Sequence, residues 1–387
     1  THEAAVSGCL AVLERLLRLR PGSAAATDSV GRTALHVAAA AGQAGSVRLI
    51  LAAAPALVGA LGADRRTALA VALADSHMAA AEVIMAASPT AAHLIVHNLA
   101  AAGQPAALAA LLDAVPSAAL HRDGSGTGWC LPLHAAAGFG NTAAVQVLLS
   151  RFSWLVGMED GRQHVPLHVA AAGGHGAAVQ LLLQAAPELA FHKASGGCTS
   201  LYLAAAHGRA HVVQLLLAAR PAAALLAAAD GSLPLHRAAA EGRAAIVQLL
   251  VAASPSAATK RNLRGQTALF IAASRGHADG VQHLLAADPR AALIADPSTE
   301  LPIHAAAREG HAAVVQLLLA ADPASASRTT GSNATALYLA TQRGHTDVAW
   351  LLLAAAPRSA MIASDRTLPI HLAAGAGDAA LVALLLS

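Results

Sequence analysis

The sequence predicts an all-α solenoid of about twelve helix-turn-helix repeats, with a 34-residue period and finger loops between them. One segment, LPIHAAAREGHAAVVQLLLAADP at residues 301–323, contains two helix-length apolar stretches on either side of a Glu-Gly-His turn. If His304 is taken as a marker, steps of 34 residues towards the N-terminus reach, in turn, Phe270, His236, Tyr202, His168 and His134. A proline stands nineteen residues after nearly every marker. A fixed period of this length is typical of stacked repeats.

The order of residues within this segment explains each part of the repeat. Pro302 suits the first turn of a helix, where a missing N–H is not needed. Gly310 can take the positive φ that ends this helix. Val314 begins a second apolar stripe at helical spacing, and Pro323 ends it. Neither short helix can bury its apolar face alone, so the segment needs copies of itself on both sides.

We predict that residues 1–387 form a single array of repeats, most of which end at one of these prolines. Its predicted repeats are 1–21 (partial), 22–55, 56–89, 90–116 (shortened), 117–153 (with a loop insertion), 154–187, 188–221, 222–255, 256–289, 290–323, 324–357 and the terminal 358–387. Only eight residues separate Pro89 from His97, against fifteen in a regular repeat, so this repeat should lack a finger loop. We expect one continuous solenoid, with a break into two arms near residue 120 as the alternative.

The repeat resembles a known family. Residues 31–39, GRTALHVAA, closely copy the opening of the ankyrin repeat, and the frame G-x-T-x-L-H-x-A-A-x-x-G-H-x-x-V-x-x-L-L runs through essentially the whole chain. The resemblance implies an ankyrin-repeat solenoid that acts as a non-enzymatic scaffold for partner proteins. It does not identify the partner.

Many repeats depart from the ankyrin pattern at the start of the first helix. Only Thr33 and His36 keep both the threonine and the histidine of that pattern. From the fifth repeat onward a Leu-Pro-His form tends to alternate with a Thr-aromatic form. Thr199, Thr267 and Thr335 can still cap their helices, each contributing roughly 1 kcal/mol. The Leu-Pro repeats replace this cap by apolar burial and a preset φ.

Composition excludes several classes of protein. No run of about 18 apolar residues occurs, so no membrane-spanning helix is expected. A net charge of +3 over a long chain is too dilute to indicate nucleic-acid binding. Cys9, Cys130 and Cys198 lie far apart, so we expect reduced thiols and take a cytoplasmic location as the default.

No pattern indicates catalysis, a cofactor or a metal. Most of the 20 histidines occupy the marker or the turn, where loop hydrogen bonds explain them, and no third ligand is spaced for zinc. Gly138-Phe139-Gly140-Asn141-Thr142-Ala143 matches a dinucleotide-binding pattern in its letters, but that pattern must follow a strand and this one follows a helix. We therefore expect no enzyme and no bound cofactor.

The remaining functional feature is the surface. The resemblance implies that the two positions before each turn glycine point into a concave face, and aromatic and arginine residues are the usual anchors of interfaces. The candidate partner-binding residues are Trp129, Phe139, His207, Glu241, Arg275, Arg308, Glu309 and Arg343. A plain solvated face is the alternative for each of them. The alternatives for the whole chain are a structural subunit of a large assembly, or the regulatory ankyrin domain of a longer enzyme or channel.

Overall fold

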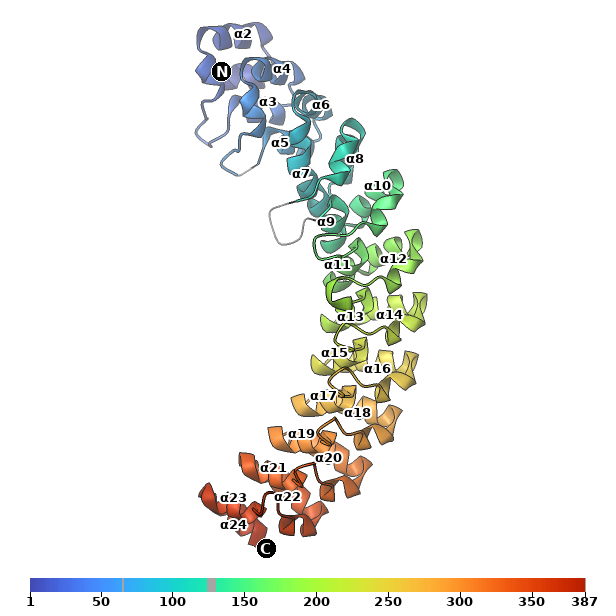
Figure 1. Cartoon of the computed structure of the whole chain (residues 1–387). Helices are drawn as coiled ribbons and strands as arrows, with labels where there is room; N and C mark the ends of the chain where they lie inside the picture. Colours follow the sequence, from blue (N-terminus) through green and yellow to red (C-terminus); the bar gives the residue numbers. More distant parts are fainter. Residues whose placement is uncertain (65, 124–129, 387) are drawn as a thin grey trace. The chain divides into compact units, whose positions relative to one another are not determined.

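The computed structural model describes residues 1–64, 66–123 and 130–386, and within these ranges it has 24 α-helices and no β-strand (Figure 1). The all-α repeat fold expected from the sequence is confirmed. The chain falls into two compact units. Unit 1 comprises residues 1–170 and 177–186, and unit 2 comprises residues 171–176 and 187–387. We call the odd-numbered helices inner and the even-numbered helices outer.

Unit 1 contains the first repeats. Its inner helices are α1 (His2–Val6), α3 (Ala34–Ala40), α5 (Ala68–Ala74), α7 (Pro89–Ala102), α9 (Pro132–Gly138) and the start of α11 (Pro166–Gly173). Its outer helices are α2 (Leu10–Leu19), α4 (Ala44–Ala53), α6 (Met78–Ala87), α8 (Pro105–Ala114), α10 (Thr142–Arg151) and most of α12 (Gly176–Ala185). Short 3₁₀ helices follow several outer helices: η1 (Pro21–Ala24), η2 (Pro55–Gly59), η3 (Pro116–Leu120) and η4 (Ser153–Gly157).

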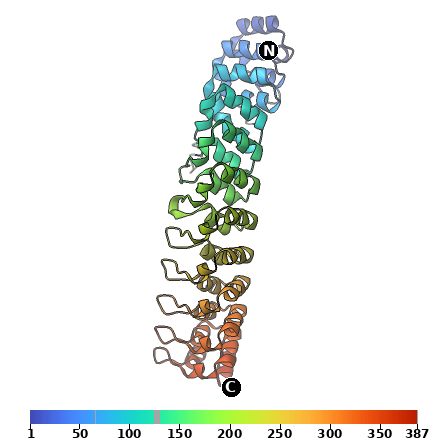
Figure 2. The same cartoon turned by 90° about the vertical axis from the view of Figure 1, so that its right-hand side faces the viewer.

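Unit 2 is built the same way, and in Figure 2 its loops project in a row from one edge. Its inner helices are α13 (Ser200–Ala206), α15 (Pro234–Ala240), α17 (Ala268–Arg275), α19 (Pro302–Glu309), α21 (Ala336–Arg343) and α23 (Pro369–Gly375). Its outer helices are α14 (Ala210–Ala219), α16 (Ala244–Ala253), α18 (Ala278–Ala287), α20 (Ala312–Ala321), α22 (Thr346–Ala355) and α24 (Ala379–Leu386). Its 3₁₀ helices are η5 (Pro187–Phe191), η6 (Ser195–Gly197), η7 (Pro221–Leu225), η8 (Pro255–Thr259), η9 (Pro289–Leu293), η10 (Pro323–Ser327) and η11 (Pro357–Met361).

Alanine makes up much of the core between neighbouring inner helices. Ala272 and Ala273 of α17 and Ala306 of α19 have no exposed surface. Side chains this small let two helices pack closely, and each inner helix of unit 2 contacts the next one in order. The outer layer supplies larger apolar groups, such as the fully buried Val315 of α20. Each repeat therefore buries its faces against its neighbours, as a solenoid requires.

The two helix-start patterns use different acceptors. In the Thr-aromatic repeats the threonine hydroxyl accepts the backbone N–H three residues on, as in Thr267 Oγ1 to Phe270 N at 3.2 Å. The predicted caps at Thr199 and Thr335 are confirmed in the same way. In the Leu-Pro repeats the marker histidine caps instead. The Nδ1 atom of His304 accepts the backbone N–H of Leu301 at 2.9 Å.

The shortened fourth repeat has no finger loop, as the sequence predicts. Helix α7 starts at Pro89, and only Ser88 separates it from the end of α6. This helix has 14 residues, whereas the regular inner helices have seven or eight. The insertion in the fifth repeat lies largely outside the described residues. The unit division falls in the sixth repeat, and whether all twelve repeats form one array stays a prediction.

No helix in the described part of the chain is both long enough and apolar enough to cross a membrane.

Candidate partner-binding surface

A row of four charged side chains and one histidine follows the C-terminal ends of five successive inner helices in unit 2. We call it the terminal row, and its members are His207, Glu241, Arg275, Glu309 and Arg343. His207 and Glu241 are the C-cap residues of α13 and α15, and the other three are the last residues of α17, α19 and α21. Since each occupies the same place in its repeat, the 34-residue period sets their spacing. Acidic and basic groups alternate along the row.

The acidic members of the terminal row already have partners. Glu241 Oε1 lies 3.2 Å from Nη2 of Arg237, four residues earlier on the same helix. Glu309 Oε1 lies 3.3 Å from Nε of Arg308, whose Nη1 is also 2.6 Å from Glu300 Oε1. Arg308, a predicted interface anchor, is thus a half-buried member of an ion-pair network.

Arg275, Arg343 and His207, the basic members of the terminal row, are exposed to solvent and are less engaged in ion pairs than its acidic members. Arg275 and Arg343 are exposed, and no carboxylate in the described ranges pairs with either of them. Arg275 Nη1 donates to the Ala240 carbonyl at 3.0 Å, which fixes the guanidinium against the preceding repeat. His207 is also exposed. These three side chains are available to another molecule.

Two clefts border the first part of the row. One, of about 550 Å³, is lined by Cys198, Tyr202, Leu203, Ala206, His207, Arg237, Glu241 and Arg243. The other, of about 380 Å³, is lined by Tyr202, Asp230, Ser232, His236, Arg237, Ala240, Asn262, Arg264, Gln266, Ile271, Ser274 and Arg275. Both include Tyr202 and Arg237, so the structure brings His207, Glu241 and Arg275 together around these two residues.

Sequence reasoning missed Tyr202 and Arg237. It counted only the two positions before the turn glycine, whereas Arg237 lies one helical turn earlier on the same face as Glu241. An i, i+4 Arg-Glu pair is visible in the sequence and could have identified Arg237. From the sequence, Tyr202 is only a replacement for the marker histidine.

The thiol and the phenol in these clefts are not activated as nucleophiles. Burial raises the pKa of the Cys198 thiol, and nearby Asp230 adds to this, so the thiol stays protonated near neutral pH. Burial also raises the pKa of Tyr202, again assisted by Asp230. Although burial would raise the pKa of Asp230, hydrogen bonds from the Ser232 backbone N–H and hydroxyl, both at 2.9 Å, keep it lowered.

In unit 1, Phe139 is the exposed candidate. Its side chain is 68% exposed at the C-cap of α9. It borders a cleft of about 460 Å³ lined by His97, Asn98, Ala101, Asp123, Cys130, His134, Ala135, Gly138, Asp160 and Val169. Trp129 lies outside the described residues. Gly138 is the last residue of helix α9, and Phe139 is its C-cap. The residues that match the dinucleotide-binding pattern therefore come at the end of a helix and not after a strand, as the sequence predicts.

Marker histidines tie one repeat to the loop of the next. His236 Nε2 bonds the Gln266 carbonyl at 3.2 Å, and His134 Nε2 bonds the His164 carbonyl at 2.8 Å. Burial lowers the pKa of both rings and of His304, although these carbonyl bonds oppose it. Neutral imidazole fits this role, because Nδ1 must accept a backbone N–H while Nε2 donates.

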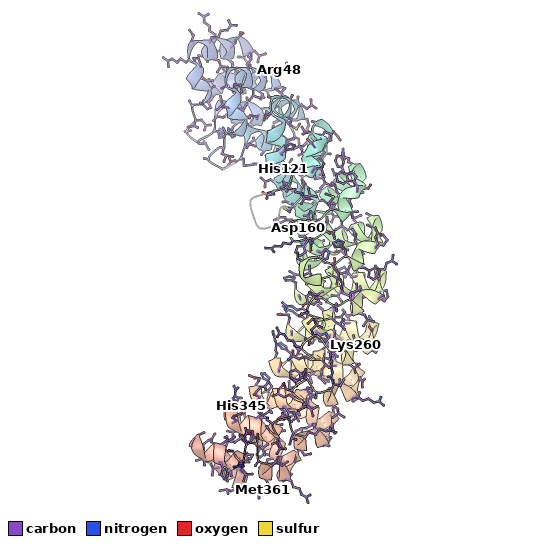
Figure 3. All side chains as sticks on the ribbon, in the orientation of Figure 1. Arg48, His121, Asp160, Lys260, His345 and Met361 are labelled. Carbon is purple, nitrogen blue, oxygen red and sulfur yellow. The ribbon has the colours of Figure 1, made fainter. Side chains whose placement is uncertain are left out.

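Turn histidines make the reverse connection. His311 Nε2 bonds the Ser274 carbonyl at 3.2 Å, and His345, labelled in Figure 3, bonds the Arg308 carbonyl at 3.1 Å. Gly276 makes room for His311, because a Cβ there would lie 2.6 Å from the imidazole Nδ1. These hydrogen bonds account for the positions of His134, His236, His304, His311 and His345. Within the described ranges, no group of three or more His, Cys, Asp or Glu could hold a metal ion.

The stacked helix pairs and the loop-tying histidines define a helical repeat protein. A family model described as ankyrin repeats in three copies matches residues 133–227, 167–261, 201–293, 235–329 and 303–387, and a model of the single ankyrin repeat matches residues 30–60. Because these matches cover more than half of the chain, the chain belongs to the ankyrin-repeat family. Ankyrin repeats are generally protein–protein interaction modules and are typically non-enzymatic. No curated protein matches the chain.

Proposed function

We propose that this chain is a non-enzymatic interaction module that binds a partner protein on the concave, inner-helix face of unit 2, along the terminal row. The observation that supports it most is the placement of exposed, chemically distinct side chains at one position in successive repeats, beside two clefts. Arginine and tyrosine are frequent interface anchors, and the row and its clefts contain both. In unit 1, Phe139 is a second candidate contact.

Position-specific photo-cross-linking tests this proposal. Lysine occurs only twice, at Lys193 and Lys260, so amine-reactive reagents would sample little of the surface. A photoreactive amino acid is placed at Gln342 on inner helix α21, and as a matched control at Gln316 on outer helix α20; both glutamines are exposed. We expect one dominant partner to be captured from Gln342 in cells and not from Gln316.

A second function, as a structural subunit of a larger assembly, is favoured by exposed apolar side chains on outer helix α22 and on η11, the 3₁₀ helix that follows it. Trp350 of α22 is 58% exposed and Met361 of η11 is 80% exposed. Large exposed apolar groups are frequent at permanent contacts. Capture of several different proteins from Gln316, with little from Gln342, would favour this function and contradict binding on the inner face.

A further inference from the structure

We propose that unit 2 recognises an acidic polypeptide segment, with carboxylates held by Arg275 and Arg343 and by the cleft beside Arg275. This inference rests on the proposed function and specifies the chemistry of the partner. Its basis is the distribution of charge, the pairing of that charge within the terminal row, and the spacing of the two arginines.

Charge is unequally divided between the two units. Unit 1 holds ten Lys and Arg and ten Asp and Glu, so it is neutral overall. Unit 2 holds fifteen basic and twelve acidic residues, so the entire net charge of +3 belongs to it. An acidic ligand therefore finds more net attraction on unit 2 than on unit 1.

Within the terminal row, Arg275 and Arg343 are the two arginines, and neither is paired with a carboxylate in the described ranges. Arg237 pairs with Glu241, and Arg308 is shared between Glu309 and Glu300. Arg275 uses one N–H on a backbone carbonyl and keeps other donors, and Arg343 is exposed. A guanidinium has five N–H donors in a fork that fits a carboxylate with two parallel hydrogen bonds.

The cleft beside Arg275 also favours an anion. Three arginines line it, Arg237, Arg264 and Arg275, against one carboxylate, that of Asp230; of the three, Arg237 is already paired with Glu241. Two hydrogen bonds from Ser232 already engage Asp230. A carboxylate of the partner would enter a polar cleft with several unused N–H donors.

Spacing gives the length of the recognised segment. Arg275 and Arg343 stand at equivalent places two repeats apart, and packed helices are about 10 Å apart, so the two guanidiniums are separated by roughly 20 Å. An extended chain rises about 3.3 Å per residue, so carboxylates about six residues apart would reach both.

A polypeptide fits this surface better than a nucleic acid. Glu241, Glu300 and Glu309 lie among the arginines of the row. A continuous phosphate backbone would pass over these carboxylates, whereas a peptide can place neutral residues or N–H groups opposite them. The small excess of positive charge points the same way.

Fluorescence anisotropy with two labelled peptides of equal charge tests the inference. Each is an otherwise Gly-Ser chain with four glutamates, arranged in one as two pairs six residues apart and in the other as a single run. With the whole chain we expect the spaced peptide to bind about threefold more tightly or better. The double variant R275E/R343E should weaken its binding by about tenfold or more.

The matched control is R290E/R358E, which makes the same charge change on η9 and η11, where both arginines are exposed. We expect its affinity to stay within about twofold of the parent, with circular dichroism confirming that both variants fold. Equal losses in the two double variants, or none in R275E/R343E, would overturn the inference. So would tighter binding of a single-stranded DNA of similar length.

This outcome can be separated from that of the proposed function. If photo-cross-linking from Gln342 captures a partner but the spaced peptide fails, the inner-face interaction stands and the acidic ligand is wrong. If the peptide binds as expected but capture occurs only from Gln316, the acidic surface exists and the proposed use of it is wrong.

Discussion

A single hydroxyl decides how each Thr-aromatic repeat begins. Thr267 Oγ1 accepts the Phe270 N–H at 3.2 Å in a fully buried environment. Thr267→Ala should therefore lower the free energy of unfolding by about 1–2 kcal/mol. Urea denaturation followed by circular dichroism measures this. Thr259→Ala on η8 should change stability by less than about 0.5 kcal/mol, since Thr259 makes only a weak 3.5 Å hydrogen bond.

Two glycines four residues apart should respond oppositely to alanine. Gly276 has φ +76°, and a Cβ there would press on His311, so Gly276→Ala should cost about 1–3 kcal/mol. Gly280 lies within helix α18 with no atom near its would-be Cβ, so Gly280→Ala should stabilise by about 0.5–1 kcal/mol. Thermal denaturation of the two variants decides, and a change of the same sign in both would contradict this account.

At the scale of helices and loops, the sequence period predicted nearly everything local. Prolines, turn glycines and Thr caps act on residues within a few positions, so their effects are readable without the fold. The extension of α7 to 14 residues was less accessible, because only the missing loop, not the lengthened helix, follows from the spacing.

Contacts between an inner helix and a loop, or between repeats, were harder to predict. The sequence predicts Arg308 as an interface anchor, but the Arg308–Glu300 pair joins inner helix α19 to the loop before it within the same repeat, so this guanidinium is largely engaged. The clefts around Tyr202 combine three successive repeats, and their lining could not be derived from one position per repeat. Packing geometry, rather than pattern, decides such sites.

The loop-tying histidines predict how stability depends on pH. Burial lowers the pKa of His134, His236 and His304 below the usual value near 6.5, so the unfolded chain binds protons first as pH falls. Their contribution is therefore complete above about pH 6.5 and is lost as pH falls below it, by up to about 1.4 kcal/mol per pH unit for each ring.

Urea midpoints measured between pH 8 and pH 5 test this dependence. His304→Tyr copies the marker of the Thr-aromatic repeats and removes one titrating ring. The free energy of unfolding of this variant should therefore change less with pH, by up to about 1.4 kcal/mol per pH unit, which corresponds to one proton. The variant will be less stable at every pH, because Leu301 N loses its acceptor. An unchanged slope would mean that His304 does not contribute.

For the whole molecule, contacts between neighbouring repeats predict that damage stays local. Leu318→Ala removes a buried side chain from α20, 1% exposed, at a cost of about 2–5 kcal/mol. Hydrogen exchange should accelerate in α18, α20 and α22 and much less in α3 and α4. Uniform acceleration over both units would indicate a single cooperative structure instead.

The two exposed tryptophans of the described chain lie on outer helix α22 and on η4, the 3₁₀ helix that follows outer helix α10. Trp154 in η4 is 52% exposed and Trp350 in α22 is 58% exposed. These two indoles are already in contact with water in the native state, so their emission will change little when the protein unfolds and is a poor probe of stability. Because Trp350 is exposed, its emission should report whether a partner covers the outer helices. A ligand on the inner helices should leave the emission maximum of Trp350 unchanged. A partner bound to the outer helices should shift this maximum to a shorter wavelength.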